Sequence, residues 1–131
     1  MIQANELRIG NWVQLKSDIS GQLKNIQVDS EWFMSEADQR LSEPIPLTPE
    51  ILEKCGFVVV KSGWYKKNYF TDCNEAVEEM QISYNIFTGR CGIGDADNDW
   101  GTAMLGKTFT SLHQLQNLYF ALTGTELIIN L

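Results

Sequence analysis

The chain has few of the residues that build disulfide frameworks, metal sites or catalytic centres. It contains 3 cysteines, 1 histidine and 3 prolines in 131 residues. Cys55, Cys73 and Cys91 are odd in number and far apart, which favours reduced thiols over a disulfide framework. The CxxC spacing typical of zinc ligands is absent from the sequence. We therefore expect reduced cysteines and no metal or other cofactor.

Long apolar runs are also missing. No stretch approaches the roughly 20 apolar residues that a membrane helix needs. A secretory signal has a basic stretch followed by an apolar one, and residues 1–6 do not begin such a pattern. The sequence predicts a cytoplasmic protein that is not associated with a membrane.

Positive charge is scarce. The chain has 10 lysines and arginines against 17 acidic residues, giving a formal net charge of −7 and a pI near 4.6. Only Lys66 and Lys67 are adjacent, and Arg8, Arg40 and Arg90 are scattered. An acidic surface without a basic stripe repels phosphate backbones and anionic lipids. Direct nucleic-acid binding is therefore not expected, and protein is the favoured type of partner.

Core-forming residues are plentiful by contrast. Hydrophobic residues make up 44% of the chain and aromatic residues 11%, as is typical of a globular protein that can bury a core. We predict a single domain over residues 1–131, with a β-rich part at 1–43 and an α+β part at 44–131.

The first part is expected to be mostly strands. Apolar alternation predicts strands at residues 12–16 and 23–28, with Ser20 and Gly21 in the turn between them. The apolar run at 32–34 predicts a third strand, and the polar stretch at 35–43 predicts a loop. This pattern is compatible with a small SH3-like barrel.

Two helices have clear start and stop signals. Thr48 is a good N-cap before Pro49 and Glu50, and Gly56 is placed to end a short central helix of about two turns. Near the end of the chain, a capping box precedes apolar residues at helical spacing, and a glycine follows. The residues of this second helix are Ser111 and Gln114 in the box, Leu112, Leu115, Leu118, Tyr119 and Leu122 on the apolar side, and Gly124.

The segment between these helices reads as sheet and loops. Residues 57–61 and 64–70 predict a hairpin around a Ser-Gly turn, and alternation over 80–86 predicts another strand. Residues 72–79 are expected to be a loop or a short helix, and the glycine-rich stretch 92–101 a loop. Further strands are expected at 102–109 and 126–129. The predicted fold class is α+β, with a mostly antiparallel sheet, a short central helix and a C-terminal amphipathic helix.

No residue is predicted to be catalytic, cofactor-binding or metal-binding. Asp95, Asp97 and Asp99 alternate like the start of a calcium loop, but Gly101 and Gly106 do not match its later positions, so a solvated turn is favoured. The hairpin aromatics could stack on bases or sugars, although such side chains more often fill a core. These aromatics are Trp64, Tyr65 and Tyr69.

The single histidine, His113, is expected to be structural, either hydrogen-bonded or exposed, because no partner for catalysis is visible in the sequence. A thiol enzyme that pairs His113 with Cys55, Cys73 or Cys91 remains an alternative. None of these cysteines has an evident activating charge. The other polar residues on this side of the last helix could form an interface, but a solvated face is the ordinary reading. They are Gln114, Gln116 and Asn117.

Three stretches, at residues 5–13, 45–52 and 112–124, resemble a group of short uncharacterised proteins of Bacteroides-type genomes and their prophages or other mobile elements. Residues 62–107 carry no motif of this group. The resemblance implies an accessory role by analogy and no particular activity, because fold relatives often differ in function.

The sequence as a whole favours a non-enzymatic accessory protein that acts through protein–protein contacts. Two alternatives stay open. One is the thiol or histidine enzyme, and the other is an acidic inhibitor that mimics the charge of nucleic acid. The inhibitor would need the carboxylates of residues 29–43 or 72–79 to form one continuous stripe. The oligomeric state is left open.

Overall fold

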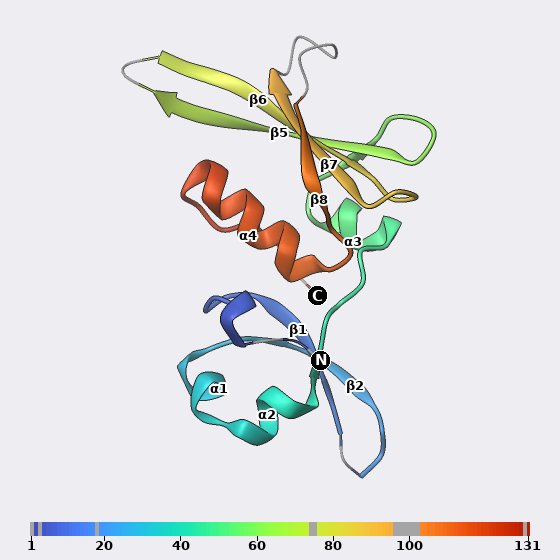
Figure 1. Ribbon diagram of the computed structural model, residues 1–131, viewed down its shortest axis with the longest axis vertical. Coiled ribbons are helices and arrows are strands. Elements are labelled where there is room, and N and C mark those ends of the chain that lie inside the picture. Colours follow the sequence, from blue (N-terminus) through green and yellow to red (C-terminus); the bar gives the residue numbers. More distant parts are fainter. Residues whose placement is uncertain (1, 3, 18, 74–75, 96–102, 130) are drawn as a thin grey trace.

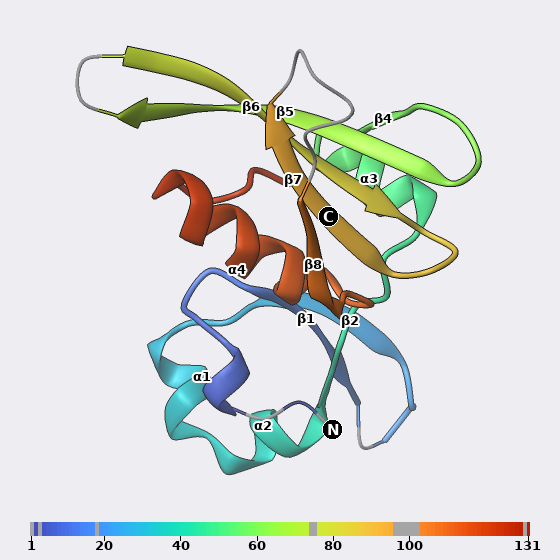
Figure 2. The same ribbon diagram turned by 45° about the horizontal axis from the view of Figure 1, so that its top comes forward.

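The computed structural model describes residues 2, 4–17, 19–73, 76–95, 103–129 and 131. The described chain forms two antiparallel sheets, one of three strands and one of five. Helix α4 (Leu112–Thr123) lies between the two sheets, as Figures 1 and 2 show. The predicted α+β class is confirmed.

The smaller sheet has the strand order β2-β1-β3. Strand β1 (Trp12–Lys16) follows a short 3-10 helix, η1 (Ala4–Glu6), and pairs with both β2 (Leu23–Gln27) and β3 (Ser42–Glu43). The strands predicted at 12–16 and 23–28 are therefore confirmed. A small buried cluster lies under this sheet, made of Ile2, Leu7, Val13, Val28 and Trp32.

The third strand predicted at 32–34 and the loop predicted at 35–43 are wrong. These residues form two short helices, α1 (Ser30–Met34) and α2 (Glu36–Leu41), and β3 is the third strand. The side chains of Asp29 and Ser35 accept hydrogen bonds from Trp32 N and Asp38 N, so each helix has a capped start. Only Trp32 of the apolar run is buried, and its Nε1 donates to Ser42 Oγ at 2.9 Å.

The larger sheet has the order β4-β5-β6-β7-β8. Its strands are β4 (Val58–Val59), β5 (Trp64–Cys73), β6 (Ala76–Asn85), β7 (Arg90–Asp95) and β8 (Ala103–Thr108). The predicted hairpin is confirmed. Ser62 and Gly63 both have positive φ, 52° and 80°, as a tight hairpin turn requires.

Two predictions about this sheet are wrong. Residues 72–79 were predicted to be a loop or a short helix. Instead, residues 72–73 belong to β5 and residues 76–79 belong to β6, and the two strands stay paired as far as Cys73 and Ala76. Residues 92–95 belong to β7 rather than to a loop, since Gly92 and Gly94 pair with residues of β6. The strand predicted at 102–109 is confirmed as β8.

Helices α3 (Pro49–Lys54) and α4 lie against the larger sheet (Figure 2). Both begin at the predicted caps. Thr48 accepts from Ile51 N, and Ser111 and Gln114 form the capping box. The apolar side of α4 joins the core, with Leu112 and Leu115 fully buried and three further residues half-buried: Leu118, Tyr119 and Leu122.

The strand predicted at 126–129 is wrong. The described chain after α4 has no regular secondary structure and pairs with no described strand. Leu127 and Ile129 are nevertheless buried in the larger core, so their apolar character reflects packing rather than sheet pairing. No helix within the described ranges is long and apolar enough to cross a bilayer.

Candidate functional site

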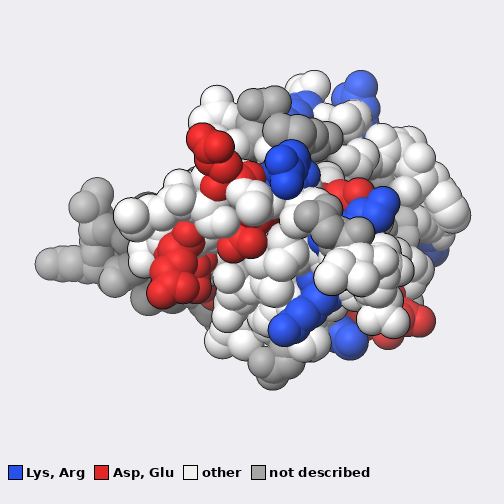
Figure 3. All heavy atoms as spheres, turned by 90° about the horizontal axis from the view of Figure 1, so that it is seen from below, with Lys and Arg blue, Asp and Glu red and all other residues white. Residues whose placement is uncertain are grey.

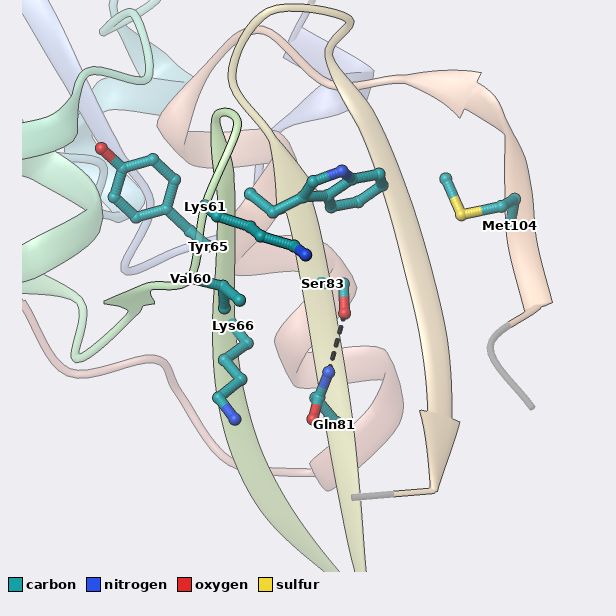
Figure 4. A pocket seen from close by; sticks show the side chains of 8 residues that line it. Val60, Lys61, Tyr65, Lys66, Gln81, Ser83 and Met104 are labelled. Carbon is teal, nitrogen blue, oxygen red and sulfur yellow. Dashed lines mark hydrogen bonds between the residues drawn. The ribbon is translucent and has the colours of Figure 1, made fainter. Parts of the chain in front are cut away.

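One face of the five-stranded sheet packs against the helices, and strand alternation puts a different set of side chains on the other face. Tyr65, Tyr84 and Cys91 are cross-strand partners on the helix side. On the opposite side, Lys66, Ser83, Gly92 and Met104 form a row across four strands. We call this second side the open face. Figure 4 shows Tyr65 pointing away from the other labelled side chains.

The open face contains a hollow of about 410 Å³. Its polar lining residues are Lys61, Lys66, Gln81 and Ser83, and its apolar ones include Val60, Trp64 and Met104. The lining residues come from the turn after β4, from β5, from β6 and from β8. Gly92 and Gly94 of β7 are buried and do not line the hollow. We call this the open-face hollow.

Gln81 is the most unusual polar group of the open-face hollow. Its side chain is only 7% exposed, and its Nε2 donates to Ser83 Oγ at 3.0 Å (Figure 4). Its Oε1 is buried and accepts no hydrogen bond from any described residue. Leaving a buried acceptor unpaired costs about 1–3 kcal/mol. An incoming hydrogen-bond donor would remove that penalty.

The charge of the hollow is opposite to that of the chain. Lys61 and Lys66 line it, whereas the described lining includes no aspartate or glutamate. The nearest described carboxylate on this face of β6 is Glu79, which follows Gln81 at the next same-face position, lies opposite Phe70 and accepts a hydrogen bond from Asn68 at 2.9 Å. The open-face hollow is therefore a locally positive site on a protein of net charge −7.

Large apolar side chains surround the hollow. Phe70 is 66% exposed and Met104 is 43% exposed, and Val58 and Val60 of the β4 edge are also exposed. The hairpin aromatics are thus divided between the two sides of the sheet. Tyr65 and Tyr69 fill the core, as the sequence favoured, while Trp64 lines the hollow. Grouped exposed apolar side chains mark contact surfaces more often than isolated ones do.

A second hollow, of about 640 Å³, lies beside the start of α4 and is lined in part by Glu6, Lys107 and His113. His113 is only 2% exposed, and neither ring nitrogen has a hydrogen-bond partner among the described residues. The alternative of an exposed His113 is therefore wrong. Its Nε2 lies 3.4 Å from Glu6 Oε2, a contact that no local sequence spacing could reveal.

Burial is the main influence on His113. It lowers the pKa of the imidazole below its usual 6.5, and nearby Lys107 lowers it slightly further. The Glu6 carboxylate acts in the opposite direction but is outweighed. The ring is therefore neutral at neutral pH. A base for catalysis would also need a nucleophile within reach, and the described lining of this hollow contains no cysteine, serine or threonine.

Two further polar residues of α4, Gln116 and Asn117, bond to the N-terminal part instead of facing only solvent, contrary to the sequence expectation, whereas Gln114 is half-exposed. Asn117 Oδ1 accepts from Arg8 Nε at 2.9 Å and from Asn11 Nδ2 at 3.0 Å. Gln116 Oε1 accepts from Trp12 N at 2.8 Å, and Arg8 also pairs with Glu126. These contacts join the stretches 5–13 and 112–124, so both stretches have a structural role in holding the N-terminal part against α4.

The described cysteines are not activated. Cys55 and Cys91 are buried, and burial raises the pKa of each thiol to about 12. The side chains of Cys73 and Asp95, and all of Asp97 and Asp99, lie outside the described residues. Among the described residues, no three histidine, cysteine or acidic side chains lie close enough together to bind a metal ion.

The acidic surface is divided. On the face shown in Figure 3, lysine and arginine side chains lie between groups of acidic side chains. Arg40 also interrupts the acidic segment 29–43 within α2. The described carboxylates of this face therefore do not form the continuous stripe that a nucleic-acid mimic needs.

Searches of family models, of curated proteins and of solved structures found no match for this chain. The resemblance noted for residues 5–13, 45–52 and 112–124 therefore stays a prediction.

Proposed function

We propose that this is a non-enzymatic accessory protein that acts through protein–protein contacts, and that its contact surface is the open face. The observation that carries the proposal is the group of exposed apolar side chains on a sheet face that no described helix covers. Met104 of β8 lines the open-face hollow, and Phe70 lies farther along β5 on the same face.

The chemistry of the described residues supports binding over catalysis. The thiols of Cys55 and Cys91 are protonated at neutral pH, and His113 is neutral and almost fully enclosed. A thiol–histidine enzyme needs an activated thiolate close to its base. Cys55 and Cys91 do not meet the first of these conditions.

The proposal also includes the type of partner and the cellular location. The net charge of −7 supports a protein partner rather than nucleic acid or an anionic membrane. We propose a cytoplasmic location, which the reduced cysteines support, and an accessory role in a phage or mobile element, which the sequence resemblance supports.

The test compares a variant of the open face with a matched control. Met104→Asp places a charge on the open face, and Ile19→Asp places the same charge on a residue that is 98% exposed in the smaller sheet's turn. Both variants and the wild type serve as bait in the lysate of the native host, and the captured proteins are identified by mass spectrometry. We expect a protein that the wild type and Ile19→Asp retain and that Met104→Asp loses.

Two results would contradict the proposal. One is a partner that all three baits retain equally, because the open face would then not be the contact surface. The other is substrate turnover by the wild type that disappears in His113→Ala, since this would make the protein an enzyme.

A further inference from the structure

Building on the proposed function, we infer that the partner docks an acidic, extended segment in the open-face hollow. In this complex the carboxylates of the segment pair with Lys61 and Lys66, and one backbone N–H group of the segment donates a hydrogen bond to Gln81 Oε1. The inference names the chemistry of the partner, which the proposed function leaves open.

The charge of the hollow selects an acidic occupant. Lys61 and Lys66 contribute two positive groups, and the described lining has no carboxylate to balance them. The rest of the protein is acidic, so a basic segment would be drawn elsewhere on the surface and an acidic one toward this hollow. Complementary charge of this kind sets orientation and association rate, and salt weakens it.

Gln81 selects a hydrogen-bond donor. Its Nε2 already donates to Ser83, whereas Oε1 is buried and accepts no hydrogen bond from the residues that the structure describes. Only a group that carries hydrogen can satisfy this oxygen. A backbone N–H of an extended chain meets that requirement.

The surroundings favour a segment of protein over a small molecule. Apolar surface continues past the hollow, across the strands to Val58 at the β4 edge and along β5 to Phe70. A small ligand would fill the hollow and leave these side chains exposed to water. An extended segment would cover them and contribute apolar side chains of its own, as in other complexes of peptides with sheets.

The probe is a random 12-residue peptide library displayed on phage and selected on the full-length protein. Enriched peptides are synthesised with a fluorescent label, and their affinities are measured by polarisation. We expect enriched peptides to combine aspartate or glutamate with apolar residues. Binding should weaken at least tenfold in Lys66→Glu and should fall with added salt. Lys16→Glu is the matched control, because Lys16 is exposed on the smaller sheet, and it should change affinity less than twofold.

A second variant tests the hydrogen bond separately from the charge. Gln81→Leu keeps the volume of the side chain but removes the free acceptor. We expect it to weaken peptide binding at least threefold while the urea midpoint shows that the protein stays folded. Unchanged affinity in a folded Gln81→Leu protein would overturn the role of Gln81.

The outcomes separate this inference from the proposed function. The enriched peptides could be neutral or basic, bind the wild type and fail to bind Met104→Asp. This result would overturn the inference that the segment is acidic but would leave the open face as the contact surface. Peptides that Met104→Asp binds as well as the wild type does would overturn both. Binding of AMP, used as a small anionic aromatic probe, with Lys66 dependence and no peptide binding, would replace the partner segment with a nucleotide.

Discussion

Asn117→Ala tests whether the polar side of α4 holds the N-terminal part in place. The wild-type side chain makes three hydrogen bonds. Its Oδ1 accepts from Arg8 Nε and Asn11 Nδ2, and its Nδ2 donates to Glu6 O at 2.8 Å. Alanine removes all of them at once and changes nothing on the leucine side of the helix.

The expected loss of unfolding free energy is about 2–4 kcal/mol. Most of it comes from Asn11, which is fully buried, because an unpaired buried donor costs about 1–3 kcal/mol. Arg8 adds roughly 0.5–1 kcal/mol, since it is half-exposed and keeps Glu126 and the Gln116 carbonyl as partners. Glu6 O adds little because water can replace Asn117 there.

Urea unfolding followed by tryptophan fluorescence measures this loss. Asn25→Ala, which removes an exposed amide from β2, is the control and should change stability by less than about 0.5 kcal/mol. If the loss arises from the Asn11 amide, Asn117→Ala should cost less in an Asn11→Ala background, giving a coupling energy of about 0.5–3 kcal/mol.

A loss below about 0.5 kcal/mol, or strictly additive effects in the double mutant, would refute the reasoning. Either result would mean that water satisfies these groups equally well and that the contacts between the N-terminal part and α4 do not stabilise the fold.

Three further outcomes are expected. Leu115→Ala should lower the unfolding free energy by about 2–5 kcal/mol and half-buried Leu118→Ala by clearly less, and equal losses in urea melts would contradict the packing of α4. Because burial lowers the pKa of His113, the unfolded chain takes up the proton first, so stability is complete above about pH 6.5 and falls below it. His113→Gln should therefore lose less stability than the wild type between neutral pH and pH 5.5, and identical pH profiles would count against a buried neutral ring. With thiol pKa values of about 12, Cys55 and Cys91 should react at pH 8 only as fast as the protein opens, and rapid labelling of either, seen by peptide mass spectrometry, would show that it is accessible.

Local signals predicted the parts of the fold whose geometry is decided within a few residues. The cap at Thr48, the capping box at Ser111 and the turn at Gly63 depend on neighbouring residues only, and all are confirmed. The helix at residues 30–34 was not predicted, because a short apolar run such as 32–34 fits a strand and a helix equally well.

The remaining features depend on partners far away in the sequence. Gly92 and Gly94 favour a loop by local propensity, but this segment pairs with β6 on one side and β8 on the other and therefore forms a strand. The open-face hollow exists only once Lys66, Ser83 and Met104 are aligned across the sheet, so no local motif marks it. The contact between Glu6 and His113 is hidden for the same reason.

The bond from Arg8 to Asn117 joins residues 109 positions apart, which has a consequence for the order of synthesis. At about 5–20 residues per second, a ribosome reaches Asn117 roughly 5–20 s after Arg8. Throughout that delay the amide of Asn11 and the backbone N–H of Trp12 lack the partners that α4 will supply. A product truncated before α4 never receives them. The N-terminal part is therefore fully stabilised only after α4 has been synthesised. Incomplete chains that lack α4 remain accessible to the cell's proteases.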